Sequence, residues 1–318
     1  MSLALNGPHP VAAALTTTTP WGAVVEAYLD AATDSAHTRR AYERHLRHAF
    51  AVVGVATVSE LTGADLARYR AAVISSDLAS GSQAQALAAV RSFLAWSRTL
   101  GAHRLSSDVM RTALKTPKVL VQRPYRTLGE PDIAAVLATA ATPRDRALLA
   151  VLLGAGLRAA EVVGLDVSDL HDDPDGGMVI AVRRGKGRRD RQVPVQPEVA
   201  RLLLAYLADR GRRLGDQGPL FRAHDHGARV RDRARLSTRA IGYLVRRALE
   251  KAGLAAKALS PHAFRHTYAI RALRAGGNVI AVQKLLGHAS VATTQRYLDH
   301  LALGELRAAV PPLPVRGT

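Results

Sequence analysis

The sequence of 318 residues has no cysteine and no long apolar run, and both absences narrow what the chain can do. Without cysteine there is no disulfide, no thiolate nucleophile and no cysteine-ligated zinc site. Without a run of about 18 apolar residues, no membrane-spanning segment is expected. Residues 1–19 lack the basic start of a signal peptide, and we expect a disordered leader there.

Acidic residues are also scarce, with 26 Asp and Glu against 44 Lys and Arg, which gives a formal net charge of +18. Most of this excess follows Arg123: 31 basic and 18 acidic residues, against 13 and 8 up to that point. A basic excess favours a polyanionic partner such as nucleic acid. The alternative is the composition of an arginine- and alanine-rich genome. The sequence has no acidic cluster of the kind that a two-magnesium nuclease needs, and we expect neither a metal nor a cofactor. We expect the protein in the cytoplasm, associated with the nucleoid.

The first part of the chain reads as a helical domain over residues 20–114. Apolar residues at helical spacing predict helices near 20–32, 37–52, 62–75 and 80–98. Their exposed sides carry basic residues, which are either solvated or in contact with DNA phosphates. The candidates for DNA contact in this domain are Arg39, Arg40, Arg44 and Arg91.

Residues 115–127 hold two prolines and four basic residues with little periodicity, which predicts a linker. A second domain follows over residues 128–318. We expect helices over 130–140, 144–153, around 199–207 and over 238–252. A further helix begins at Pro261, another covers 279–286, and a short one capped by Ser290 carries Tyr297. Residues 178–183 and 191–195 alternate apolar and polar side chains around a Gly-Lys-Gly tip, which predicts a β-hairpin. The expected fold is therefore mainly α, with a helical first domain and a mixed α/β second domain that holds a small antiparallel sheet.

Two arginines in distinctive contexts are suited to hold a phosphate. Arg158 follows a glycine-rich turn in Gly-Leu-Arg-Ala-Ala-Glu, and Arg265 ends a His-x-x-Arg pair that begins at His262. The guanidinium fork can bind two phosphate oxygens and keeps its proton. The alternative for Arg158 is an ion pair with Glu161, three residues along the same helix face. Glu161 would then orient the arginine.

A tyrosine and two histidines are candidates for the attack on a phosphodiester. Tyr297 is a candidate nucleophile in a polar setting, although a late tyrosine usually serves packing, and its ordinary pKa of about 10 demands a cationic environment or a base. His262 could supply a base or a hydrogen bond to the phosphate. His288 follows Leu286-Gly287 at a helix end that faces the tyrosine segment.

A departing deoxyribose 5′ oxygen needs a proton, and Lys186 at the predicted hairpin tip is a candidate general acid. Its alternative is a generic basic turn. The arginines around it predict a phosphate-contact patch, to which Arg191 also belongs, and the DNA-binding candidates here are Arg183, Arg184, Arg188 and Arg189. Zinc is rejected for the pair His262 and His266, because the residues between them supply a cation instead of the glutamate base of a metalloprotease helix.

Together, Arg158, Lys186, His262, Arg265, His288 and Tyr297 resemble the catalytic residues of the tyrosine recombinase (phage integrase) family. The resemblance covers about residues 20–310. The helical first domain is similar to the family's core-binding, SAM-like domain, and the compact build is most similar to the Xer type. The tail after Tyr297 is similar to the family's C-terminal helix, which docks on a neighbouring protomer.

The resemblance implies an enzyme that cleaves and rejoins DNA at specific sites through a 3′-phosphotyrosyl bond, without ATP or metal. It implies a homo- or hetero-tetramer on double-stranded DNA, a monomer when free, and roles such as DNA integration or chromosome partition. A type IB topoisomerase would use the same residues as a monomer. A non-catalytic DNA-binding regulator would explain the charge and the helices, but not six matched positions.

Overall fold

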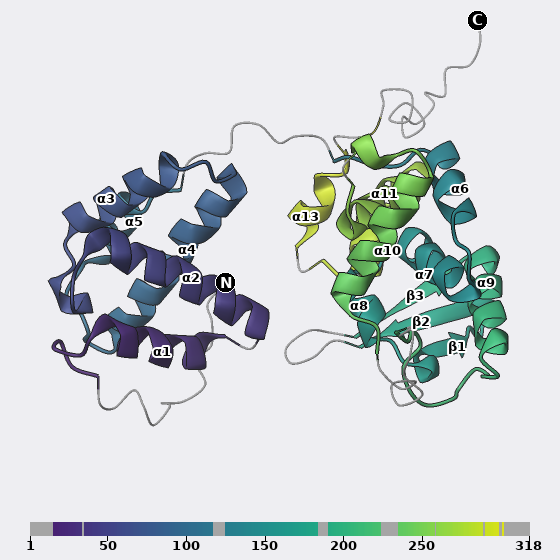
Figure 1. The fold of residues 1–318 in the computed structure, drawn as a ribbon, viewed down its shortest axis with the longest axis horizontal. Coiled ribbons are helices and arrows are strands. Elements are labelled where there is room, and N and C mark those ends of the chain that lie inside the picture. Colours follow the sequence, from purple (N-terminus) through teal and green to yellow (C-terminus); the bar gives the residue numbers. More distant parts are fainter. Residues whose placement is uncertain are drawn as a thin grey trace, which may run out of the picture. The chain divides into compact units, whose positions relative to one another are not determined.

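The computed structural model describes residues 15–33, 35–116, 125–183, 190–223, 235–257, 259–288, 290–298 and 301. The chain divides into two compact units, Met1–Gln122 and Arg123–Thr318 (Figure 1). Each unit is built around its own apolar core. The division falls inside the segment 115–127 that we expected to be a linker.

Unit 1 is helical. It contains α1 (Trp21–Ala32), α2 (Ala36–Val53), the 3-10 turn η2 (Val58–Glu60), α3 (Gly63–Ile74), α4 (Ser80–Thr99) and α5 (Ser107–Ala113). Local chemistry sets the helix ends: the Ser35 hydroxyl accepts the Thr38 amide at the start of α2, and Gly54, with a φ of 75°, ends it. Ala79 holds the N-cap position of α4, without a side-chain hydrogen bond.

Residues just before α1 pack against the rest of unit 1. Ser59 donates a hydrogen bond to the carbonyl oxygen of Thr17 at 2.6 Å, and Leu15 packs on the unit's core. These residues belong to the segment 1–19 expected as a disordered leader, of which residues 1–14 lie outside the described residues. The short helix α5 was not anticipated.

Unit 2 contains a three-stranded antiparallel sheet in the order β1 (Leu170–Asp172), β2 (Met178–Val182), β3 (Arg191–Val195). Ile180, at the centre, pairs with Leu170 on one side and Val193 on the other. The predicted hairpin is confirmed as β2 and β3. The strand β1 was missed, because three residues are too few to show an alternating pattern.

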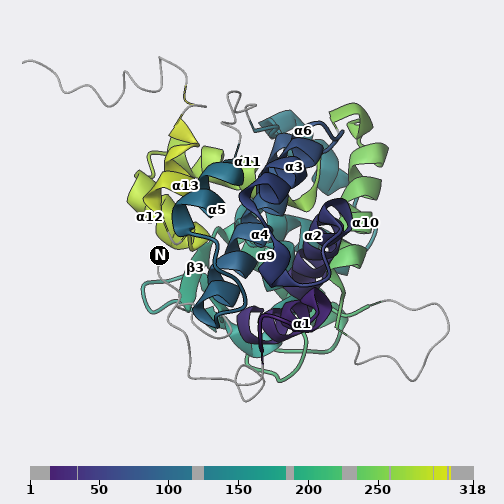
Figure 2. The same ribbon diagram turned by 90° about the vertical axis from the view of Figure 1, so that its left-hand side faces the viewer.

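The remaining elements of unit 2 are mostly helical: the 3-10 turns η3 (Val167–Asp169) and η4 (Ala255–Lys257), and the helices α6 (Glu130–Ala138), α7 (Pro143–Gly154), α8 (Ala159–Gly164), α9 (Pro197–Asp209), α10 (Thr238–Lys251), α11 (Pro261–Arg274), α12 (Val279–Leu286) and α13 (Val291–Gln295). After its polar first turn, helix α7 is apolar around its circumference and buried from Ala147 to Leu153, as expected of a central helix. Helix α11 packs against α7 and α12, and α12 contacts both β3 and α13. Figure 2 shows α12 and α13 together at one edge of the unit. The predicted fold class is confirmed.

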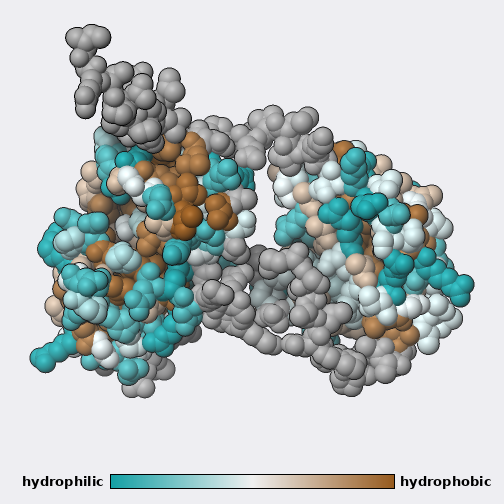
Figure 3. Space-filling view, turned by 180° about the vertical axis from the view of Figure 1, so that it is seen from behind, coloured by the Kyte–Doolittle hydropathy of each residue, from teal (hydrophilic) through white to brown (hydrophobic). Residues whose placement is uncertain are grey.

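The surface of unit 2 is mixed. Figure 3 shows hydrophobic residues gathered on one face of this unit among hydrophilic ones. Among the described residues, its exposed large apolar side chains are Leu204, Tyr243, Ile280 and Val291. Within the residues described, no helix combines the length and the apolar character needed to cross a bilayer.

Candidate active site

The turn between α7 and α8 places Arg158. Gly156 adopts a φ of 62°, and a Cβ atom there would lie 2.2 Å from the ring of Tyr268, so both the conformation and the space require glycine. Arg158 is the N-cap residue of α8. Its backbone amide donates to Glu161 Oε2 at 2.9 Å, and its Nη1 donates to Glu161 Oε1 at 2.8 Å. The ion pair with Glu161, given above as the alternative for Arg158, is therefore present.

Arg265, in the second turn of α11, is the largest fully buried side chain among the described residues and is 1% exposed. Its Nη1 donates to the carbonyl oxygen of Gly156 at 2.7 Å, and its Nη2 to that of Leu286 at 2.6 Å. The Nε atom is buried and has no hydrogen-bond partner within the described part of the chain. A buried N–H group without a hydrogen bond is costly in free energy. This nitrogen is therefore suited to donate to an incoming anionic oxygen.

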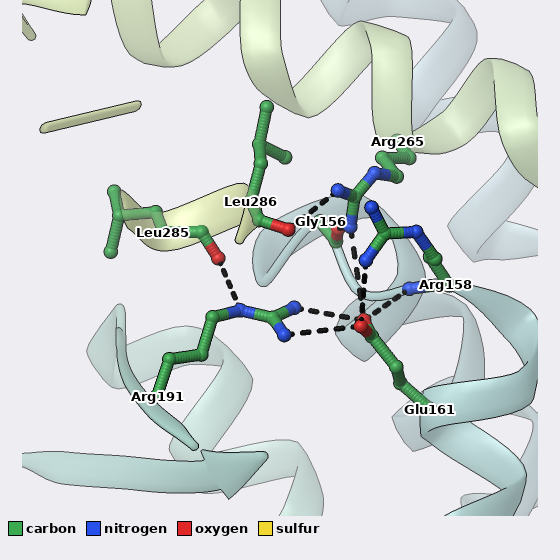
Figure 4. Close-up of polar contacts among 7 residues, drawn as sticks. All are labelled: Gly156, Arg158, Glu161, Arg191, Arg265, Leu285 and Leu286. Atoms are coloured by element: carbon green, nitrogen blue, oxygen red, sulfur yellow. Dashed lines mark hydrogen bonds and ion pairs between the residues drawn. The ribbon is translucent and has the colours of Figure 1, made fainter. Parts of the chain in front are cut away.

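Glu161 is shared by three arginines (Figure 4). Arg191 binds it at two points, with Nη1 to Oε1 at 3.1 Å and Nη2 to Oε2 at 2.8 Å. Arg265 Nη1 lies 3.8 Å from Oε2. Burial pushes the pKa of Glu161 upward, but the hydrogen bonds from Arg191 and from the amide of Arg158 outweigh it and lower the pKa from 4.5 to about 2.

Arg158 and Arg265 have neighbouring guanidinium groups, as Figure 4 shows. Burial, and next the charge of Arg158, lower the pKa of Arg265 to about 10. The group remains a cation at neutral pH. A single carboxylate offsets three guanidinium groups here, so the site carries an excess of positive charge that a bound phosphate would relieve. Arg158, with a third of its side chain exposed, gives access to the site.

His262, in the first turn of α11, lies close to the arginines. Burial lowers its pKa, and the charges of Arg265 and Arg158 lower it further. The neutral imidazole therefore predominates at neutral pH, and it can accept one hydrogen bond and donate another. Its ring meets the ring of His266 edge-on, with the centroids 4.4 Å apart.

Tyr297 is 2% exposed and packs in a small apolar cluster with α11 and α12. Burial raises the pKa of its phenol to about 12, whereas the charges of Arg265, Arg296 and Arg158 oppose the rise. Its hydroxyl lies 2.8 Å from His266 Nδ1. We expected α13 to carry this tyrosine; instead the helix ends at Gln295, two residues earlier.

His288 follows the end of α12, where Gly287 has a φ of 63°. Its amide donates to the carbonyl oxygen of Gln283 at 3.1 Å, which fixes the backbone. Its Nδ1 lies 2.8 Å from the hydroxyl of buried Thr294. The rings of His288 and Tyr297 are nearly parallel, with the centroids 6.3 Å apart. The histidine therefore faces the tyrosine segment, as the sequence indicated.

The structure places five of the six residues that could perform the chemistry on adjoining elements of unit 2: Arg158, His262, Arg265, His288 and Tyr297. Lys186 lies outside the described residues, together with Arg184, Arg188 and Arg189. Among the described residues, no group of three or more His, Cys, Asp or Glu side chains is placed to share a metal ion.

The DNA-contact candidates differ in their surroundings. Arg39 pairs with Asp30 at 2.5 Å and with Glu26 at 2.7 Å. Arg40 and Arg44 are exposed on α2 and have no ion-pair partner within the described residues. Arg91 is part-buried and reaches the carbonyl oxygen of Leu114 at 3.5 Å. Arg183 pairs with Asp169 at 2.7 Å but keeps 64% of its side chain exposed.

Sequence reasoning misplaced one arginine and missed two residues. The assignment of Arg191 to a phosphate-contact patch is wrong. Its side chain is 8% exposed and binds Glu161 and the carbonyl oxygen of Leu285. His266 was considered only as a zinc ligand. Tyr125, from the expected linker, stacks on the His266 ring at 3.9 Å between centroids. The four-residue spacing of His262 and His266 was the one available signal.

Two family models match this chain. The phage integrase family model matches residues 126–303, and the model of the phage integrase N-terminal SAM-like domain matches residues 26–100. The two matches fall within the second and first units, respectively.

Several curated proteins are similar over most of the chain. Tyrosine recombinase XerC of Mycobacterium tuberculosis is 35% identical over 283 residues, which is 86% of this chain and 91% of that protein. Tyrosine recombinase XerC of Myxococcus xanthus is 36% identical over 235 residues, covering 70% and 73%. Tyrosine recombinase XerA of Thermococcus kodakarensis is 31% identical over 289 residues, covering 89% and 93%.

Solved structures share the fold. The site-specific recombinase XerH, bound to a palindromic difH substrate in a post-cleavage complex, matches with a TM-score of 0.70 at 19% identity, covering 92% of this chain and 84% of that one. A lambda integrase dimer bound to a COC' core site matches with a TM-score of 0.66 at 15% identity, covering 88% and 95%.

Proposed function

This chain belongs to the phage integrase family of tyrosine recombinases and is a site-specific DNA recombinase, and we propose that Tyr297 is its nucleophile and that Arg158 and Arg265 hold the scissile phosphate. One observation carries the proposal: the buried Arg265 keeps an unpartnered Nε, within the described residues, beside the partly exposed Arg158. Two neighbouring cations with donors to offer form a site for an anion, and Tyr297 lies within their electrostatic reach.

The chemistry follows from these positions. The two arginines stabilise the charge on the non-bridging oxygens as Tyr297 attacks phosphorus. His262, neutral and close to both arginines, donates a hydrogen bond to the same phosphate, and His288 supports the tyrosine segment through Thr294. Glu161 orients Arg158 by binding both its amide and its guanidinium. The proton for the departing 5′ oxygen is assigned to Lys186 from the sequence alone, because this residue lies outside those that the structure describes.

The product is a 3′-phosphotyrosyl bond that stores the energy of the phosphodiester, so that a free 5′-hydroxyl from another strand can reverse it. On this basis the reaction needs neither ATP nor a metal. Double-stranded DNA is the substrate, the nucleoid is the place of action, and four protomers, identical or of two kinds, act together on DNA. The structures of XerH and lambda integrase bound to DNA support the choice of substrate.

A covalent-trapping experiment tests the nucleophile. A duplex selected by the protein from a random library would be nicked near the cleavage point, so that the released strand diffuses away and the adduct accumulates. The wild-type protein should give a denaturation-resistant protein–DNA band, with or without EDTA. Tyr297→Phe should bind the duplex and give no band.

The matched control is Tyr268→Phe, a tyrosine on the same helix as Arg265 whose ring packs beside Gly156. It keeps the ring and should keep the adduct. A band from Tyr297→Phe would reject the nucleophile, and a band lost in EDTA and restored by a divalent cation would reject the metal-free mechanism. Relaxation of supercoiled plasmid without site preference would favour a type IB topoisomerase. Light scattering of free and DNA-bound protein tests the change from monomer to tetramer.

A further inference from the structure

The hydroxyl of Tyr297 has one hydrogen-bond partner within the described residues, and it is His266. The phenol keeps its proton at neutral pH, because burial raises its pKa to about 12. A protonated phenol donates, so Nδ1 of His266 accepts and the imidazole carries its proton on Nε2. The pair is therefore already arranged for proton transfer from oxygen to nitrogen.

The other two histidines of the site are engaged elsewhere. Nδ1 of His288 is bonded to the Thr294 hydroxyl, and its ring lies nearly parallel to the Tyr297 ring, with the centroids 6.3 Å apart. His262 meets His266 and the two arginines. Neither has a hydrogen bond to the phenol, although both were the candidates from the sequence.

We propose that His266 is the general base that takes the phenolic proton when Tyr297 attacks the phosphate, an assignment that rests on Tyr297 being the nucleophile. The Oη–P bond forms, the P–O5′ bond breaks, and the proton moves from Oη to Nδ1 of His266. The departing O5′ takes a different proton, from the acid on the leaving-group side. In religation the incoming 5′-hydroxyl gives up its proton on that side, and His266 returns a proton to Tyr297.

One neighbour of His266, Tyr125, suits a base that becomes a cation. Tyr125 stacks on its ring with 3.9 Å between centroids, and an aromatic face stabilises an imidazolium. Within the described residues, the other charged and titratable groups around His266 and Tyr297 are Tyr125 before α6, Arg158 at the start of α8, His262 and Arg265 on α11, His288 after α12 and Arg296 after α13. His266 also follows Arg265 directly on α11, so one helix positions both the phosphate ligand and the base.

The substitution His266→Asn separates proton transfer from positioning. The amide oxygen of asparagine can accept the Tyr297 hydrogen bond near the place of Nδ1, but it cannot take the proton. We expect adduct formation on the nicked duplex to slow by about 10²–10⁴-fold at neutral pH, the usual range for removal of a general base, with DNA affinity unchanged. The rate of the variant should rise steadily with pH, because hydroxide replaces the base.

A more acidic nucleophile provides the second arm. When 3,5-difluorotyrosine is incorporated at position 297, the more acidic phenol depends less on a base. The fluorinated His266→Asn protein should therefore react at close to the rate of the fluorinated protein that keeps His266. His262→Asn is the matched control, one turn away on the same helix, and its rate should not be recovered. If circular dichroism shows that the asparagine variant is misfolded, His266→Gln provides the same comparison.

Three results would overturn the assignment: His266→Asn cutting at the wild-type rate, cutting faster because the bond only restrains the tyrosine, or gaining nothing from the fluorinated phenol. These differ from a failure of the proposed function, in which Tyr297→Phe itself forms the adduct.

Discussion

Arg191 on β3 forms a two-point ion pair with Glu161 on α8, and the pair ties the sheet to the turn that carries Arg158. Both side chains are buried, at 8% and 11% exposure. Removing one partner of a buried pair leaves the other charge without compensation, which is strongly destabilising. The pair therefore matters to the stability of unit 2 as well as to the orientation of Arg158.

The first prediction is that Glu161→Gln destabilises unit 2 in a pH-dependent way. The pKa of Glu161 is about 2 in the folded protein against an ordinary 4.5, so its stabilisation is complete above pH 4.5 and is lost as pH falls toward 2. At neutral pH this is on the order of 3 kcal/mol, or roughly 6–12 °C in melting temperature. The difference between wild type and variant should shrink between pH 4.5 and pH 2.

Circular dichroism would measure the melting temperature, and fluorescence gives an internal control, because Trp21 and Trp96, the two tryptophans of the sequence, both lie in unit 1. The fluorescence transition should not move. Glu130→Gln is the matched variant: Glu130 binds Arg271 at 2.6 Å but is 70% exposed, and such pairs contribute about 0–1 kcal/mol. A variant of Glu161 as stable as that control would contradict the prediction.

The sequence predicted the individual elements better than the contacts between them. A helix end was foreseeable where glycine marks it, as at Gly287 after α12. The role of Arg191 was not, because a basic run next to a hairpin tip does not show which arginine turns inward. Only the pairing of Arg191 with Val182 across the hairpin, and the packing of α12 on β3, set that direction.

The candidate site shows the same limit. Ordered motifs predicted that Arg158, Arg265 and Tyr297 act together, and the structure places them in one cluster. No such motif marks His266 and Tyr125. His266 contacts Tyr297, which is 31 residues away in the sequence, and Tyr125 contacts His266, which is 141 residues away. Such contacts depend on the packing of α11 against the C-terminal segment, which periodicity does not report.

The second prediction concerns DNA binding by α2. Arg40 and Arg44 are one turn apart on the same helix face and lack carboxylate partners among the described residues, whereas Arg39 is bound to Asp30 and Glu26. Replacing Arg40 and Arg44 by alanine should lower the slope of log affinity against log salt by about 2, because each phosphate that the protein no longer neutralises reduces the slope by about 0.9.

Arg39→Ala is the control on the neighbouring face, and its slope should stay near that of the wild type, because its charge is already offset. Fluorescence anisotropy with a labelled duplex across a salt series would give both slopes. An unchanged slope for the double variant would show that this face of α2 does not touch phosphates.

The third prediction is that Tyr125 positions His266. Tyr125→Leu keeps an apolar side chain but removes the planar stack, and an aromatic pair contributes about 0.5–1.5 kcal/mol, so adduct formation should slow roughly twofold to tenfold. Tyr125→Phe keeps the stack and should restore the wild-type rate. DNA affinity should be the same for all three proteins. Equal rates for the Leu and Phe variants would assign the ring to packing alone.

The fourth prediction separates the two sides of the phosphate. If Lys186 protonates the departing oxygen, Lys186→Ala should cut normal DNA slowly. It should recover most of its rate on a substrate with sulfur at the 5′ bridging position, because a thiolate leaves with little need of a proton. Arg158→Ala should gain no such recovery, since a guanidinium bound to Glu161 acts on the non-bridging charge. His266→Asn should gain none either, because His266 acts on the attacking oxygen at the opposite side of phosphorus.

The three variants would be compared under single-turnover conditions with wild type on both substrates. If sulfur leaves Lys186→Ala as impaired as before, Lys186 only binds the phosphate, and another group must protonate the leaving oxygen.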